Sequence, residues 1–212
     1  MISRFLAFIP LAGLVLAGCG PQPASKALER PAAIEAEGVY VHGPSGMAFP
    51  LEVGPFQRGR LTRYDAAGLD VGAGYEARSE AGPVAATVFV YPAPSVMSFG
   101  SPPGVAEGAK AGMCGRQYED ARDDAARGLK GARLVAEEPA AAPHGESLVF
   151  GRMAAFEAAG RDGPIRSVLY LYCSRQSPWA MKYRFTGTEE ALQAAPVEAF
   201  MAGLPWPKPS GK

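Results

Sequence analysis

Histidine and cysteine are scarce in this chain of 212 residues, which contains two histidines and three cysteines. A structural zinc site needs four Cys or His ligands and a catalytic one needs three at defined spacing, and the chain offers neither. The nucleophile-elbow pattern fails at its last position, where Met47 follows Gly43-Pro44-Ser45-Gly46. A phosphate-binding loop and a dinucleotide fingerprint are also missing. The sequence therefore predicts no metal site, no cofactor and no catalytic residue.

The chain also has no excess of charge of either sign. Lys and Arg number 21, Asp and Glu number 21, and the formal net charge is zero. Binding to nucleic acid through phosphate neutralisation needs a basic excess, so we expect no nucleic-acid partner. Hydrophobic residues make up 48% of the chain, enough for a packed core, while 26 glycines and 20 prolines favour a loop-rich fold over a helical bundle.

No hydrophobic run is long enough to cross a bilayer comfortably. The longest uncharged apolar stretch runs from Phe5 to Gly18, is interrupted by Pro10 and follows the single charge of Arg4. About 20 apolar residues are needed to span the hydrocarbon core. A basic start, a short apolar region and small residues at its end are typical of an export signal, here residues 1–18.

The end of this signal carries the most specific motif in the sequence. Leu16-Ala17-Gly18-Cys19 resembles a bacterial lipobox. The resemblance implies cleavage between Gly18 and Cys19 and acylation of the Cys19 sulfur, which would anchor the protein to the membrane. Gly20 follows instead of the aspartate associated with inner-membrane retention. We therefore expect an outer-membrane anchor facing the periplasm in a Gram-negative cell, and otherwise the outer face of the plasma membrane. An ordinary signal peptide with an incidental cysteine is the alternative.

The remaining chain divides into a lipidated tether at 19–37, a single domain at 38–207 and a tail at 208–212. Alternating or continuously apolar patterns predict three strong strands, with Arg166–Cys173 apolar on both faces and Trp179–Thr186 on one. The strong strand candidates are 84–91, 166–173 and 179–186, and the weaker ones are 57–64, 70–77, 133–137 and 147–156.

Two helices are expected among these strands. Cys114, Tyr118, Ala121, Ala125 and Leu129 form a helical stripe within 105–130. The second helix runs from an N-cap at 188 to about 204, and its internal proline at 196 either kinks it or restarts it. The order of elements predicts an α+β domain on a mostly antiparallel sheet, with one long central helix and a C-terminal helix.

This element order, with the ending KYRFT…FMAGLPWP, is similar to the PsbP/Mog1-like sandwich over roughly residues 45–205. The resemblance implies the fold of several exported accessory proteins. A generic α+β fold of another topology remains the alternative.

With Cys19 assigned to the lipid, Cys114 and Cys173 remain as a pair in an oxidising compartment. Cys114 lies on the helical stripe and Cys173 shares a strand face with Leu169 and Leu171. A helix packed on that face brings the two together, so we expect a disulfide. Two buried free thiols are the alternative.

These features predict a lipid-anchored, periplasm-facing accessory or binding protein without a catalytic site. Its partner would be the membrane, through the lipid, and an envelope protein, a glycan or a small apolar ligand. The alternative is an envelope hydrolase with an unrecognised site. The sharpest candidate for that reading places Ser45 or Ser147 within about 3 Å of His42 or His144 in a concave site.

Overall fold

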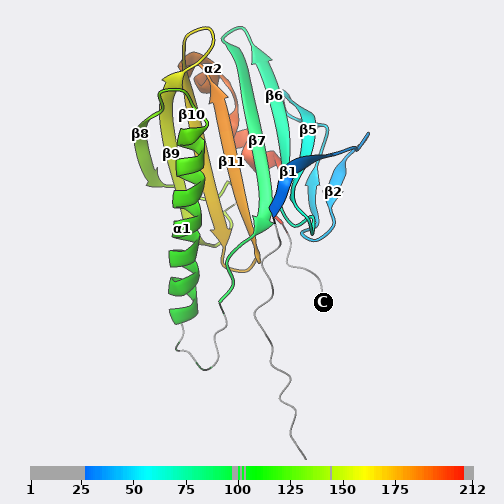
Figure 1. Ribbon diagram of the computed structural model, residues 1–212, viewed down its shortest axis with the longest axis vertical. Helices are drawn as coiled ribbons and strands as arrows, with labels where there is room; N and C mark the ends of the chain where they lie inside the picture. The colour runs from blue at the N-terminus through cyan, green and yellow to red at the C-terminus, as the bar shows by residue number, and fades with distance from the viewer. Residues whose placement is uncertain (1–26, 97–99, 101, 103, 144, 208–212) are drawn as a thin grey trace, which may run out of the picture.

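A computed structural model of the protein describes residues 27–207, apart from 97–99, 101, 103 and 144. Most of it is one antiparallel sheet (Figure 1). The strands of this sheet are β1 (Ala27–Ile34), β4 (Glu52–Val53), β5 (Phe56–Asp65), β6 (Val71–Ser79), β7 (Gly82–Pro92), β8 (Arg133–Pro139), β9 (Leu148–Ala159), β10 (Pro164–Ser174) and β11 (Trp179–Gly187).

The sheet consists of two meanders that meet at its centre. The strand order is β1-β5-β6-β7-β11-β10-β9-β8, with β4 paired to β5. Within each meander, consecutive strands pair with their neighbours, and the long connection from β7 to β8 contains the helix α1 (Val105–Arg127). This helix lies on the near face of the sheet in Figure 1, over β9 and β10.

Strand alternation gives the sheet two covered faces. In β11, Met181, Tyr183 and Phe185 point into a core that also contains Phe56 and Phe200. A second core lies under α1 and holds Cys114, Tyr118, Leu169 and Leu171, among others. Strand β10 contributes to both cores, which confirms the prediction of a central strand that is apolar on both sides.

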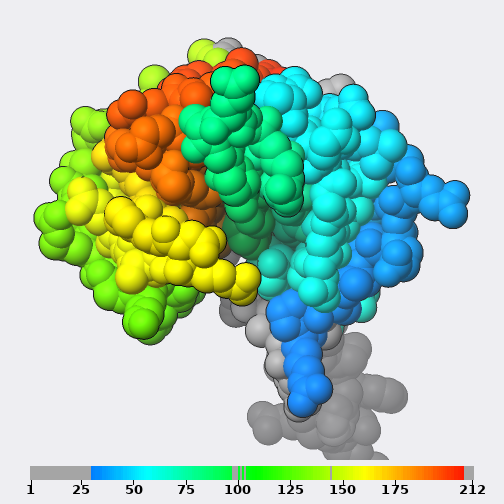
Figure 2. Space-filling model, turned by 90° about the horizontal axis from the view of Figure 1, so that it is seen from above, coloured from blue at the N-terminus to red at the C-terminus, as the bar shows by residue number. Residues whose placement is uncertain are grey.

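The larger core is closed by two short helices, α2 (Glu189–Ala194) and α3 (Val197–Gly203). Thr188 caps α2, its hydroxyl accepting the Ala191 N–H at 3.2 Å. The sequence predicts one C-terminal helix here, with a kink or a restart at Pro196. In the structure the helix restarts: α2 ends before Pro196 and α3 begins after it. Proline has no N–H, so it cannot donate the hydrogen bond that would continue α2. Seen from above, α2 (orange) lies between the yellow β9–β10 turn and the teal β6–β7 turn (Figure 2).

A separate hairpin of β2 (Tyr40–His42) and β3 (Met47–Phe49) packs on the same core through Met47 and Phe49. Arg58 fixes this segment to the sheet. Its guanidinium donates hydrogen bonds to the backbone carbonyls of Phe49, Ala36 (3.1 Å) and Gly38 (2.7 Å). One guanidinium thus satisfies three backbone carbonyls, two of which, those of Ala36 and Gly38, lie outside any strand.

The antiparallel α+β class predicted from the sequence is confirmed, and every predicted strand forms. The prediction of a tether over 19–37 is wrong for part of that range. Residues 27–34 form β1, which pairs with β5 at the edge of the sheet. Pro31 interrupts the pattern that would identify a strand, but an edge strand tolerates proline. None of the described helices is both long enough and apolar enough to cross a membrane.

Candidate functional site

A cavity of about 540 Å³ lies between α3 and the β8–β10 part of the sheet. We call it the α3 groove. Its walls come from β8, the segment that follows it, β9, β10 and α3. The residues that line it are Glu138, Pro139, Ala140, Ala141, Pro143, Met153, Tyr170, Tyr172, Glu198, Ala199, Met201 and Ala202.

Two tyrosines of β10 form the aromatic wall of the α3 groove. Tyr170 and Tyr172 are two residues apart and therefore project from the same face of the strand. Their rings are stacked, with centroids 6.2 Å apart and planes inclined by 16°. Tyr172 is only 1% exposed and also contacts Tyr183 and Trp206 edge to face. Through this contact the indole of Trp206 packs back onto the domain.

The rim opposite α3 is fixed by a close backbone contact. The Ala140 N–H donates to the Gly151 carbonyl at 3.0 Å, so the segment after β8 continues alongside β9. A Cβ at position 151 would lie 2.3 Å from the Ala140 carbonyl oxygen. Only glycine permits this approach, which places Pro139, Ala140 and Ala141 along the cavity.

Two carboxylates of the α3 groove have no ionic partner among the described residues. Glu138 of β8 and Glu198 of α3 both line the cavity, and neither forms an ion pair or a hydrogen bond there. The neighbouring Glu137 differs, because Arg122 and Arg152 pair with it at 3.4 and 3.5 Å. Burial raises the pKa of Tyr170, and the charges of Glu198 and Glu138 raise it further. The groove is therefore apolar in its walls and negative at its edges.

A second cavity of about 200 Å³ adjoins the α3 groove. Its lining includes Val168, Phe185 and Leu192, and it shares Tyr170 and Glu198 with the larger cavity. These two residues therefore lie where the cavities meet, and the hollow continues beside α3 toward α2.

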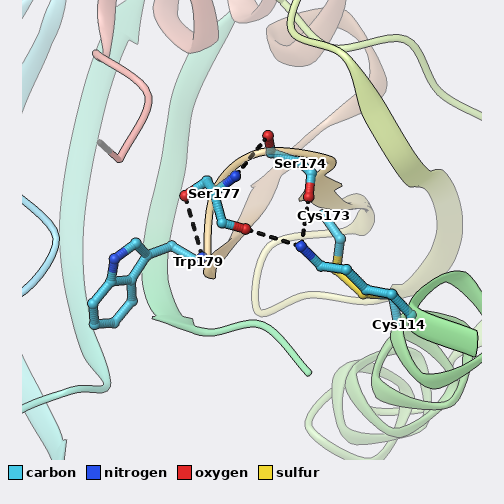
Figure 3. The surroundings of a disulfide bond; sticks show 6 residues. Cys114, Cys173, Ser174, Ser177 and Trp179 are labelled. Carbon is cyan, nitrogen blue, oxygen red and sulfur yellow. Dashed lines mark hydrogen bonds between the residues drawn. A yellow bond between two sulfur atoms is a disulfide. The ribbon is translucent and has the colours of Figure 1, made fainter. Parts of the chain in front are cut away.

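The predicted disulfide between Cys114 and Cys173 is present, with Cα atoms 6.6 Å apart. Both cysteines are fully buried, and they join α1 to the end of β10. Figure 3 shows the turn after Cys173, in which Ser177 and Ser174 organise the backbone that leads to Trp179. Lys110 of α1 donates to the carbonyls of Ser174 and Ser177 at 2.8 and 3.0 Å. The helix is therefore joined to this part of the chain both by the disulfide and by the Lys110 hydrogen bonds. The predicted lipidation site, Gly18 and Cys19, lies outside the described residues, as does His144.

The structure brings together one serine–histidine pair that the sequence identifies. The Oγ of Ser45 lies 2.7 Å from Nδ1 of His42, whose Nε2 lies 2.8 Å from the Gly68 carbonyl oxygen. A carbonyl only accepts, so Nε2 carries the proton and Nδ1 accepts from the serine hydroxyl. Burial lowers the pKa of His42, which favours the neutral ring.

This pair is buried. His42 is 1% exposed and Ser45 is 2% exposed, and neither lines the two cavities described above. Both belong to the turn between β2 and β3, where Ser45 Oγ also accepts the Met47 N–H at 3.2 Å. The His42 imidazole packs edge to face against the Trp179 indole, with ring centroids 5.4 Å apart. The geometry is that of a hydrogen-bonded turn packed into the core.

On the face covered by α1, Lys182 lies over the Phe89 ring, with its Nζ 4.0 Å from the ring centroid. Burial lowers the pKa of Lys182 and raises the pKa of Asp70 to about 6, while the two charges partly stabilise each other. Asp70 Oδ1 is buried without a hydrogen bond. No group of three or more His, Cys, Asp or Glu suited to a metal ion occurs among the described residues.

Comparisons with known proteins give little further identification. No family model matches the chain, and no curated protein matches it. Among solved structures, the chain is similar to the crystal structure of PA94, a protein of unknown function from Pseudomonas aeruginosa. The two are 15% identical, with a TM-score of 0.37, and the match covers 66% of this chain and 88% of that one.

The sequence did not reveal the α3 groove. Its residues come from separate segments of the chain, and only the spacing of Tyr170 and Tyr172 signals a shared face. The alternate apolar residues of the strand from Trp179 to Phe185 are buried in the larger core and line no part of the α3 groove.

Proposed function

We propose that this protein is a lipid-anchored binding protein of the bacterial envelope, facing the periplasm, whose ligand occupies the α3 groove. The cavity is the observation that carries this proposal. Its volume of about 540 Å³ falls within the usual range of small-molecule sites, and its walls combine aromatic and methionine side chains with two carboxylates. The lining contains no Ser, Cys, His or Lys, and its titratable groups are the carboxylates of Glu138 and Glu198 and the phenols of Tyr170 and Tyr172.

The location rests on the lipobox and on the disulfide. Leu16-Ala17-Gly18-Cys19 supports an acylated Cys19, and a disulfide between Cys114 and Cys173 is typical of an oxidising compartment. Seven residues separate Cys19 from the start of β1 at Ala27. Such a link reaches at most about 28 Å, so the domain would stay close to the membrane surface.

Binding in the groove can be tested with the uncharged fluorophore N-phenyl-1-naphthylamine, whose emission rises in apolar surroundings. We expect saturable binding to the purified mature protein and loss of binding in Ala199→Phe, which fills the cavity from α3. Ala194→Phe is the matched control, because Ala194 is an exposed helical alanine that lines neither cavity. Equal binding by both variants would show that the probe does not use the groove.

An envelope hydrolase is the second candidate, favoured by the contact between Ser45 and His42. The hydroxyl and the imidazole are correctly placed for proton transfer. The burial of both residues denies a substrate access to Ser45 Oγ, however, and a hydrolase of this kind would require the β2–β3 turn to open.

A further inference from the structure

The α3 groove is lined by two carboxylates that form no ion pair with any described residue. Glu138 and Glu198 stand on opposite walls, one on β8 and the other on α3, and both act on the phenol of Tyr170. The charge of Arg166 acts on the same phenol in the opposite direction, and its guanidinium pairs with Glu189 at 2.8 Å. Arg152 lies against Glu137 and the Tyr118 ring on the other face of the sheet.

The tyrosines add unused polar groups to the same hollow. No described residue forms a hydrogen bond with the hydroxyl of Tyr172, although the residue is only 1% exposed and lines the cavity. The hydroxyl of Tyr170 likewise has no hydrogen-bond partner among the described residues. A buried phenol normally finds a partner, so this one has a hydrogen-bonding capacity that a ligand would satisfy.

The aromatic wall is itself suited to a positive charge. The rings of Tyr170 and Tyr172 stack on each other along β10, so one face of each ring is turned to its neighbour. A cation within about 6 Å of a ring centroid on a free face is attracted by the quadrupole of the ring. Met153 and Met201 supply adaptable apolar surface beside these rings. The groove therefore offers two carboxylates, two aromatic rings and an apolar floor to one occupant.

From these observations we infer that the ligand of the α3 groove is an organic cation, an ammonium or guanidinium group carried on an apolar arm. This rests on the proposed function and names the ligand class of the same site. The charged group lies between Glu138 and Glu198 against the face of Tyr170, and the arm extends along Met153 and Met201. The adjoining cavity beyond Tyr170 and Glu198 leaves room for a ligand that continues toward α2.

The charge preference can be measured with a pair of fluorescent probes that differ at one end. Dansylcadaverine carries an ammonium group on a five-carbon arm, and dansyl-6-aminohexanoate carries a carboxylate on an arm of similar length. We expect the mature protein to bind the ammonium probe at least tenfold more tightly. Glu138→Gln and Glu198→Gln should each weaken that binding about two- to fivefold, the range typical of accessible ion pairs. The double variant should bind both probes equally.

Two further variants separate charge from shape. Tyr170→Phe keeps the ring and should retain most of the affinity for dansylcadaverine, whereas Tyr170→Leu should lose about fivefold. Glu190→Gln is the control, because Glu190 is an exposed carboxylate of α2 that lines neither cavity. If the ammonium and carboxylate probes bind the wild type equally, or if the glutamine variants change nothing, the charge inference is wrong.

The outcome also separates this inference from the proposed function. Binding of N-phenyl-1-naphthylamine that Ala199→Phe abolishes, with no preference for the ammonium probe, would retain the binding site and reject the cation. Loss of both signals would reject both. Displacement of dansylcadaverine by octylamine alone would identify a free amine, and displacement by the peptide acetyl-Ala-Leu-Lys-Leu-Ala-amide would identify a lysine side chain. Either result supports the cation class.

Discussion

Cys114 of α1 and Cys173 of β10 join the long helix to the centre of the sheet across 59 residues of sequence. The helix needs this link, because its buried residues are only Cys114, Tyr118 and Ala125. Most of the helix surface is polar or glycine, and such a helix derives little stability from burial. The disulfide and the Lys110 hydrogen bonds to the turn after β10 attach α1 to the sheet where apolar packing alone contributes little stability.

We therefore predict that replacing both cysteines with alanine lowers the free energy of unfolding by roughly 4 kcal/mol, as expected for closing a loop of this length. Chemical denaturation followed by circular dichroism measures the change. Hydrogen exchange in the double variant should increase first in α1, since the sheet keeps its own pairing. Unchanged unfolding with unchanged exchange in α1 would show that packing alone holds the helix.

Gly151 allows the rim of the α3 groove to lie close against β9. Gly151→Ala places a Cβ against the Ala140 carbonyl, so either the rim moves or the protein loses about 2–3 kcal/mol of stability. We expect weaker binding of N-phenyl-1-naphthylamine in both cases. Gly112→Ala is the matched control: nothing lies within 4 Å of its Cβ, and alanine should stabilise α1 by about 0.5–1 kcal/mol.

The strands were predictable where alternation is long and regular. The pattern from Trp179 to Thr186 has a period of two and forms β11 almost residue for residue. Strands β2, β3 and β4 have only two or three residues each, too few to show a period. β2 and β3 pair with each other, and Arg58 links β3 to the large sheet through the Phe49 carbonyl. Tertiary contacts alone specify such segments.

The candidate site was less predictable for a different reason. The disulfide can be predicted from Cys114, Cys173 and the assumption that the helix packs on the strand face that carries Cys173. The sequence alone is therefore sufficient to predict it. The α3 groove depends on Glu138, Tyr170 and Glu198 converging from β8, β10 and α3. No local motif relates these positions, because their proximity arises from strand order and from the restart of the helix at Pro196.

Asp70 should make stability depend on pH. Its pKa is raised from 3.8 to about 6, mainly by burial, so the folded state binds the proton more tightly than the unfolded state. Between these values stability falls as pH rises, and the full destabilisation is present above pH 6. Asp70→Asn removes it. We expect the gain of the variant over the wild type to grow by about 1 kcal/mol between pH 4 and pH 7, a value reduced for partial solvent contact.

Urea denaturation at both pH values tests this prediction. His42 has a lowered pKa, and its contribution is lost as pH falls below 6.5. The comparison of variant with wild type cancels that opposite trend. Asp120→Asn, an exposed carboxylate on α1, should show a flat difference. A flat difference for Asp70→Asn as well would mean that Lys182 fully compensates the burial of Asp70.

The lipid anchor is tested at Cys19. Wild-type protein expressed in a bacterial host should partition into the detergent phase and carry acyl mass on its first residue, because more than one acyl chain makes anchoring stable. Cys19→Ser should remain as an uncleaved, unacylated precursor. Cys114→Ser is the matched control, since its cysteine belongs to the disulfide. A mature wild-type protein without acyl mass would exclude the anchor.

The contact between Ser45 and His42 distinguishes a structural turn from a nucleophile. Ser45 Oγ donates to His42 and accepts from the Met47 N–H, so Ser45→Ala leaves two buried partners unsatisfied. We expect a loss of about 1–3 kcal/mol in the free energy of unfolding. Ser79→Ala, which removes an exposed hydroxyl bonded only to the Gly82 carbonyl, should change stability by less than about 0.5 kcal/mol. An activated serine would react with a fluorophosphonate probe, whereas a hydroxyl held in this core would not. Labelling of Ser45 in the folded protein, detected by peptide mass spectrometry and lost in His42→Ala, would establish the hydrolase instead.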